Sequence, residues 1–138
     1  MIQRQQTLWL LLSGISALLS FMYPFVTGKI VEKGIEVDSS VNASSNFLIL
    51  LITGAILVLA IAAIFLYKNR KLQGTLCIPG ILFSLGVIVL YVMQMNKMTK
   101  STLALFCILP LFMLIGFILA YRNIRKDEKL VKSLDKLR

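Results

Sequence analysis

The stretch FLILLITGAILVLAIAAIFLY, residues 47–67, decides the fold class of this chain. It contains no charged side chain, and Thr53 is its only hydroxyl-bearing residue before the closing Tyr67. At about 1.5 Å of rise per residue, a helix of this length reaches about 30 Å, the thickness of the hydrocarbon core of a bilayer. Because backbone polar groups in lipid must be satisfied within their own segment, we expect a transmembrane helix here.

Three further apolar blocks accompany this one, at about residues 7–26, 72–95 and 102–121. Hydrophobic residues make up 58% of the 138 residues, against about 45–50% in an ordinary soluble domain. The short connections between the second, third and fourth spans predict antiparallel neighbours. We therefore predict an all-α fold: a four-helix transmembrane bundle over residues 1–121, followed by a basic, amphipathic, cytoplasmic helix over residues 122–138.

The only sizeable loop is predicted between the first two spans, at residues 28–46. Within it, the alternating residues on either side of Lys33-Gly34 suit a small β-hairpin, although an isolated hairpin is only marginally stable. The first span follows a short polar start, but no small-x-small cleavage pattern follows it, so we expect an uncleaved helix rather than a signal peptide. Pro24 is expected to mark its outer end.

The charge distribution predicts the orientation of the bundle. Under the four-span topology, eleven of the fifteen basic residues share the side of the two termini, and four lie on the other side. Lys and Arg near span ends remain in the cytoplasm, so both termini are expected inside and the loop at 28–46 outside. The net charge of +9 is accounted for in this way, and we expect no nucleic-acid binding.

The interiors of the four spans contain few ionisable or reactive side chains. No Asp, Glu, Lys or Arg lies in the middle of a span, which argues against a proton-coupled transporter. Pro79 and Pro110 lie inside predicted spans, where we expect simple kinks. Small residues at helical spacing are interpreted as packing positions or, alternatively, as a dimerisation face or polar path; they are Ser13, Ser16, Ala17, Ser20, Gly80, Ser84, Gly116 and Ala120.

One tyrosine stands near the C-terminal end of each span, and Trp9 stands near the start of the first. Such rings commonly lie at the headgroup level of a bilayer, with the apolar body inward and the polar tip outward. We therefore predict four interfacial anchors: Tyr23, Tyr67, Tyr91 and Tyr121.

The chain offers no recognisable catalytic, metal or cofactor site. It has two cysteines and no histidine, so the commonest general base and metal ligand is missing. Cys77 and Cys107 are expected near opposite membrane faces, too far apart for a disulfide. We expect a protein that is not an enzyme and needs no cofactor.

The segment 122–138 is the most informative part of the chain. Four apolar residues share one face at helical spacing: Leu130, Val131, Leu134 and Leu137. Basic residues dominate the remainder, among them Arg122, Arg125, Lys126 and Arg138. Three acids are interspersed: Asp127, Glu128 and Asp135. One interpretation is a helix lying on anionic lipids of the inner leaflet. The other is a docking helix for a protein partner; the basic residues favour the first, and the acids keep the second open.

Both ends of the chain resemble a family of small four-span membrane proteins typical of Bacteroidetes-type bacteria, known as domain of unknown function 4293. The motifs that carry the resemblance are Met1-Ile2-Gln3-Arg4-x-Gln6-Thr7 and Arg122-x-Ile124-Arg125-Lys126-Asp127-Glu128-x-Leu130-Val131, continued by Ser133 and Asp135-Lys136-Leu137-Arg138. The resemblance implies a bacterial inner-membrane location and offers no information on activity. Because Arg4 and the tail are expected on one cytoplasmic face, we hypothesise that they form a joint interaction site.

Two functions remain open at this stage. The first is a structural or interaction protein that acts through its cytoplasmic face, with the lipid bilayer, an unidentified protein or a second copy of the chain as partners. The second is a small oligomeric channel or transporter. The four compact spans, the prolines and the small residues support it.

Overall fold

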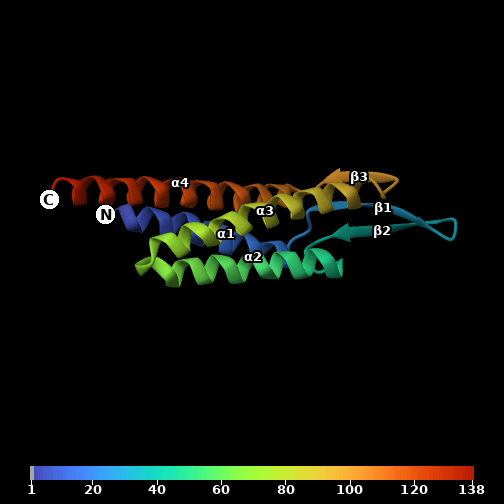
Figure 1. Cartoon of the computed structure of the whole chain (residues 1–138). Coiled ribbons are helices and arrows are strands. Elements are labelled where there is room, and N and C mark those ends of the chain that lie inside the picture. Colours follow the sequence, from blue (N-terminus) through green and yellow to red (C-terminus); the bar gives the residue numbers. More distant parts are fainter. Residues whose placement is uncertain (1) are drawn as a thin grey trace.

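Four long helices lie side by side, and a small β-sheet covers one end of the bundle (Figure 1). The computed structural model describes residues 2–138, and side chains from residue 5 onward. The helices are α1 (Ile2–Met22), α2 (Phe47–Phe65), α3 (Arg70–Met95) and α4 (Ile108–Lys136), joined in part by the short 3-10 segments η1 (Leu66–Lys68) and η2 (Leu105–Cys107). The strands are β1 (Val26–Glu32), β2 (Ile35–Val41) and β3 (Lys100–Leu103).

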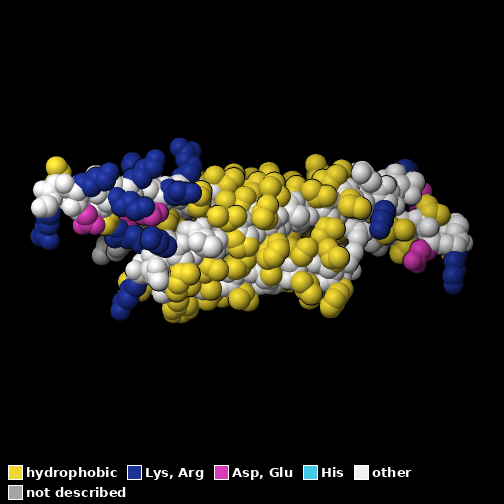
Figure 2. Space-filling view, in the orientation of Figure 1, with side chains coloured by type: hydrophobic (Ala, Val, Ile, Leu, Met, Phe, Trp, Pro, Cys, Tyr) yellow, Lys and Arg dark blue, Asp and Glu magenta, His cyan; other side chains and the backbone are white. Residues whose placement is uncertain are grey.

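All four helices are long and apolar enough to cross a membrane, as counted over residues 2–138. The predicted helical bundle is thereby confirmed as a fold. Apolar side chains cover the middle of its surface in a broad band (Figure 2); Leu82 and Val58, for example, remain 62% and 64% exposed. Apolar surface this extensive is typical of a protein whose solvent is lipid.

The sheet corrects the prediction of a purely helical fold. The β1–β2 hairpin turns at Lys33 and Gly34, with φ of 51° and 82°, which is the backbone of the two-residue turns that suit the twist of a hairpin. The weakly predicted hairpin is therefore confirmed. Strand β3 was not predicted: it pairs antiparallel with β1 and gives the order β2-β1-β3, so β1 is bonded on both sides over its first four residues.

Two predicted span boundaries are also wrong. The first helix ends at Met22, because Pro24 follows and Phe25 already donates its backbone N–H to the carbonyl of Val41, at 2.7 Å. The fourth helix begins at Ile108 rather than at 102, because residues 100–103 pair with β1 instead. Pro110 thus lies in the first helical turn, where a missing N–H costs no helical hydrogen bond, and the kink expected there is not required.

The small residues pack where helices meet, which favours the packing interpretation. Ser13 and Ala17 are fully buried in α1. A Cβ on Gly116 of α4 would meet the Ser13 hydroxyl and lie 2.7 Å from the Trp9 carbonyl oxygen. A Cβ on Gly80 of α3 would lie 2.6 Å from the ring of Phe117. Glycine therefore permits the close approach of the α1 backbone at position 116 and of the Phe117 ring at position 80.

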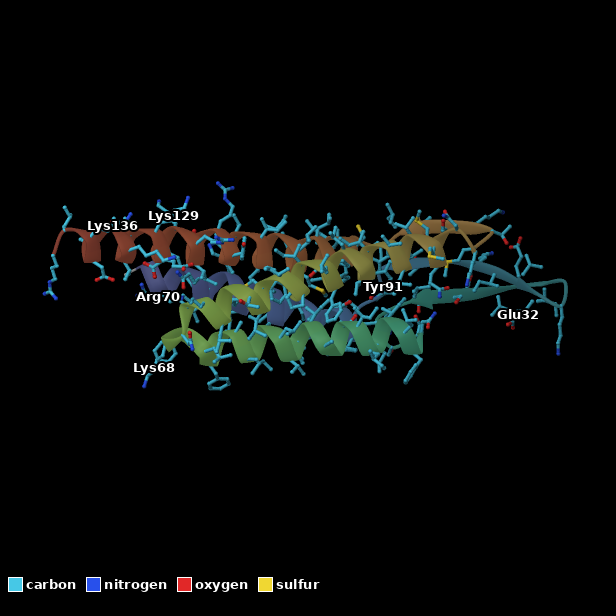
Figure 3. The ribbon with its side chains drawn as sticks, in the orientation of Figure 1. Glu32, Lys68, Arg70, Tyr91, Lys129 and Lys136 are labelled. Carbon is cyan, nitrogen blue, oxygen red and sulfur yellow. The ribbon has the colours of Figure 1, made fainter. Side chains whose placement is uncertain are left out.

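Tyr91 corrects the prediction of four interfacial anchors. Its side chain is fully buried and points into the bundle (Figure 3). Its hydroxyl lies 3.0 Å from the Ser20 hydroxyl, and its ring stacks on Phe25 at a centroid distance of 4.3 Å. Tyr67 is 51% exposed near the opposite end of the bundle, in line with the original interpretation for that residue.

Candidate functional site

The two ends of the molecule differ strongly in charge. We call the end that carries both termini the basic end, since residues 68–71 and 122–138 place their cationic side chains there; the opposite end, with the three strands, is the sheet end (Figures 1 and 2). Eleven of the fifteen basic residues belong to the N-terminal segment, residues 68–71 and residues 122–138. The basic end is therefore the candidate functional site.

Helix α4 reaches the basic end and continues beyond the other helices (Figure 1). It runs without a break from Ile108 to Lys136, so residues 122–136 continue the fourth helix rather than restarting after it. Ile124 and Asp127 are buried, at 1% and 7% exposure. The bundle therefore includes the first turns of the segment 122–138, and the freely projecting part begins after Glu128.

Asp127 fixes this junction. Its Oδ2 lies 3.4 Å from the Arg70 Nε of α3 in an ion pair, and it accepts a hydrogen bond from the Gln6 side-chain amide of α1, also at 3.4 Å. Three helices thus meet on one carboxylate. The sequence had assigned Asp127 to an exposed interaction face together with its neighbours; the structure places this side chain inside the bundle instead.

Gln73 of α3 is a second buried polar side chain near this end. It is 1% exposed, and its amide nitrogen donates to the backbone carbonyl of Ala63 in α2, at 3.0 Å. Together with the Asp127 cluster, this bond fixes how α1, α2, α3 and α4 are arranged at the basic end. Sequence reasoning missed Gln6 and Gln73; amide side chains at the ends of otherwise apolar spans were the available signal.

The exposed face of α4 carries two local pairs. The Arg125 Nε donates to the Tyr121 hydroxyl at 2.9 Å, and its guanidinium lies 5.4 Å from the centroid of that ring. Lys132 and Glu128 form an ion pair at 2.9 Å, at the i, i+4 spacing that brings helical side chains together. The hydrogen bond and the charge of Lys132 lower the pKa of Glu128, which lies beyond the apolar band. Glu128 is therefore ionised and paired at neutral pH.

A hollow of about 260 Å³ lies between the start of α3 and α4. Three cationic residues and one acid line it, together with hydroxyl and apolar groups. The lining residues are Arg70, Lys71, Gly74, Thr75, Ile78, Tyr121, Ile124, Arg125 and Glu128. Cations on two helices facing one hollow can bind an anionic group.

Beyond Glu128, the four predicted apolar residues of the tail are all exposed. Leu130 and Val131 are 44% and 39% exposed, and Leu134 and Leu137 are 64% and 84% exposed. Arg122, Lys126, Asp135 and Arg138 are exposed as well. The predicted amphipathic face is thus present and uncovered by any part of the described chain.

The hypothesis that pairs Arg4 with the tail stays a prediction, since the Arg4 side chain lies outside the described residues. Nearby, Gln6 of α1 does contact Asp127 of α4, so the first helix and the base of the tail lie side by side. Within the described part of the chain, no group of three His, Cys, Asp or Glu side chains is placed to hold a metal ion. The arrangement at the basic end is suited to binding.

Fold and site together define a small bundle of four apolar helices with a polar sheet at one end and a basic helical extension at the other. The chain belongs to the family described as domain of unknown function DUF4293, whose model matches residues 2–137. The resemblance seen in the terminal motifs is thereby confirmed at the level of the family. No curated protein and no solved structure matches the chain.

Proposed function

We propose that this chain is a non-enzymatic membrane adaptor that holds a rigid helix in the cytoplasm for a protein partner. Its bundle would cross the inner membrane of a bacterium, with both termini inside and the sheet outside. The apolar band on the face shown in Figure 2 and the four long apolar helices support membrane insertion. The excess of Lys and Arg at the basic end supports the orientation, since such residues near span ends are retained in the cytoplasm.

The continuity of α4 is the observation that carries this proposal. The helix extends past the bundle roughly along the direction of the four spans (Figure 1). From Glu128 to its last residue, Lys136, the helix rises about 12 Å. A helix on the membrane surface would have to bend sharply where α4 leaves the bilayer, whereas this helix passes that point without a break and is held there by Asp127.

The chemistry of the projecting helix fits a helical partner. Leu130, Leu134 and Leu137 follow the i, i+4, i+7 spacing with which an amphipathic helix anchors in an apolar groove. They are exposed by 44% or more, and burying them would supply the hydrophobic contribution to binding. The surrounding charges are mostly basic, with the acids Glu128 and Asp135 interspersed, and this pattern would give such an interface its specificity.

Two buried serine hydroxyls do not favour the transport alternative. The Ser13 hydroxyl donates to the carbonyl of Met113 at 3.1 Å, and the Ser84 hydroxyl donates to the carbonyl of Gly80 at 2.6 Å. These groups are engaged with neighbouring or preceding backbone, as in helices that pack tightly in lipid. An adaptor needs such a tightly packed bundle. The interaction role therefore remains favoured over the transport alternative.

Photo-crosslinking in intact membranes tests the proposal. A photoreactive amino acid replaces Leu134 on the apolar row or, as the control, Ser133 beside it. We expect a discrete adduct with one other protein from position 134 and none from 133. That protein, once purified, should bind the full chain, and Leu134→Asp should abolish binding while Ser133→Asp, which adds the same charge, should not.

Two results of this experiment would overturn the adaptor proposal. Adducts with lipid alone would mean that the segment after Glu128 lies on the membrane surface. Adducts only between copies of this chain would mean that the helix serves self-association.

A further inference from the structure

We propose that the hollow between α3 and α4 at the basic end is a binding site for the phosphate group of an anionic phospholipid. The hollow measures about 260 Å³, so it would hold a small charged group rather than a protein segment. The inference rests on the proposed membrane insertion, but it is independent of any protein partner of the tail.

The charge of the hollow fits an anion. Arg70 and Lys71 reach it from the first turn of α3, and Arg125 reaches it from α4. Cations from two helices can approach one phosphate from different sides, and arginine does so with paired donors. These three residues lie where the start of α3 meets the base of the projecting helix, and Figure 2 shows cationic side chains gathered at this end, next to the apolar band.

Existing ion pairs leave the hollow positive. The one acid in its lining, Glu128, already pairs with Lys132 at 2.9 Å. Arg70 forms an ion pair with Asp127, whose side chain is largely buried in the bundle. Arg125 contacts only the neutral Tyr121 in its hydrogen bond. A phosphate oxygen would therefore meet at least two cations, Lys71 and Arg125, that no acid fully neutralises.

Helices α3 and α4 lie close together at Gly74. A Cβ on Gly74 would make ordinary van der Waals contact with the Ile124 side chain, at 3.4 Å, so a residue larger than alanine at position 74 would narrow the hollow. The Thr75 and Tyr121 hydroxyls complete the polar part of the wall. The Tyr121 hydroxyl accepts from Arg125 and can donate its own hydrogen to a phosphate oxygen, whereas the Thr75 hydroxyl already donates to the Lys71 carbonyl at 2.9 Å.

The apolar part of the wall argues for a lipid as the source of the phosphate. Ile78 lies two helical turns further along α3 than Lys71, on the way into the apolar band, and it is 47% exposed. A phosphate bound by Lys71 and Arg125 would thus have an apolar surface beside it on which acyl chains can lie. Basic pockets between membrane helices on the cytoplasmic side bind lipid headgroups in this way.

A second hollow, of about 580 Å³, adjoins the first and shares Arg70 and Lys71 with it. It adds Lys68 and Asn69 from the turn between α2 and α3, and Val131 from the tail. Lys68 and Arg70 lie at this same corner of the bundle in Figure 3. The cationic surface therefore continues around the start of α3, where the glycerol or a second headgroup could rest.

Lipid binding to the full-length protein tests the site. The protein is purified in a zwitterionic detergent and titrated with phosphatidylglycerol, phosphatidylcholine or inorganic phosphate, with native mass spectrometry to count bound molecules. The pocket variant is Lys71→Gln/Arg125→Gln. The control is Lys129→Gln/Lys136→Gln, which removes the same charge from exposed tail positions (Figure 3) outside the hollow. Single Lys71→Gln is the variant of choice if the double pocket variant folds poorly.

We expect the wild type and the tail control to bind phosphatidylglycerol at least tenfold more tightly than phosphatidylcholine. The pocket variant should lose about tenfold in affinity for phosphatidylglycerol, as expected from removing two contributing cations. Equal losses in both variants would show a diffuse attraction and overturn the site. Equally tight binding of inorganic phosphate would overturn the lipid as its ligand.

The outcome can be separated from that of the adaptor proposal. A chain truncated after Ser133 retains every residue of the hollow and also Lys132, the partner of Glu128, so it should bind lipid normally even though it has lost Leu134 and Leu137 from the apolar row. A wild-type protein that washes off membranes would refute insertion itself. Loss of lipid binding in the pocket variant alone is specific to the hollow.

Discussion

Asp127 on the fourth helix and Arg70 at the start of the third meet at 3.4 Å, and both lie at the base of the projecting helix. The Asp127 side chain is only 10% exposed and that of Arg70 is 28% exposed. An ion pair this sheltered is screened less by solvent than one on the surface. Because Gln6 of α1 donates to the same carboxylate oxygen, the pair sets the direction in which α4 leaves the bundle.

Asp127→Ala is expected to lower the free energy of unfolding by about 1–3 kcal/mol, because it leaves Arg70 and Gln6 without their shared acceptor. Thermal or denaturant unfolding in detergent micelles measures the change. Asp135→Ala removes an exposed acid from the same helix and should change stability by less than about 0.5 kcal/mol.

A double-mutant cycle with Arg70→Gln separates the pair from other effects of the substitution. We expect a coupling energy of at least about 0.5 kcal/mol. Additive losses would show that Asp127 and Arg70 contribute independently to stability. The conclusion that their ion pair holds the base of the projecting helix would then be wrong.

Gly116→Ala is expected to lower the stability of the bundle by about 1–3 kcal/mol through overpacking. The added Cβ would meet the Ser13 hydroxyl and lie 2.7 Å from the Trp9 carbonyl oxygen, so α1 and α4 would have to separate. Gly86→Ala is the matched control, because nothing lies within 4 Å of a Cβ at that position of α3.

The control variant should be neutral or stabilise by up to about 1 kcal/mol, since alanine favours a helix interior over glycine. Equal effects of the two substitutions in the same detergent would contradict the close approach of α1 and α4.

Sequence alone predicted the four helices because each is specified by a long local run of apolar residues. It also predicted the β1–β2 hairpin, whose turn residues lie next to each other. It missed strand β3, because Lys100–Leu103 is only four residues long and becomes a strand through pairing with Val26–Lys29. A contact between segments so distant in the sequence leaves no local periodicity.

The candidate site was predicted in the same uneven way. The exposed apolar row from Leu130 to Leu137 follows from helical periodicity, and it lies on the projecting helix as that periodicity requires. The inward position of Asp127 did not follow, because it depends on where Arg70 and Gln6 lie in space. The hollow between α3 and α4 likewise depends on packing, to which Gly74 gives only an ambiguous local signal.

Gly28→Val is expected to detach β3 from β1. A Cβ at Gly28 would lie 2.5 Å from the Lys100 carbonyl oxygen and 2.9 Å from the Met98 sulfur, so the two strands could not keep their spacing. Hydrogen exchange measures the effect: the amides of Thr99 and Ala104, which bond to Lys29 and Phe25, should exchange faster.

Ser40→Ala serves as the control for this substitution, because it alters an exposed side chain on β2. It should leave these amides protected. Unchanged protection in Gly28→Val would mean that β3 does not depend on the close approach at this glycine.

Tyr91→Phe is expected to lower the free energy of unfolding by about 1 kcal/mol, because it leaves the Ser20 hydroxyl without its partner at 3.0 Å. The ring itself, stacked on Phe25 at 4.3 Å, is retained, so the fold should persist. Tyr67→Phe is the control, since that side chain is 51% exposed and should lose only a few tenths of a kcal/mol. In Ser20→Ala, a further Tyr91→Phe substitution should cost clearly less than in the wild type. The free energy of unfolding of each variant is measured in detergent. A larger loss in Tyr67→Phe than in Tyr91→Phe would contradict the buried hydrogen bond of Tyr91.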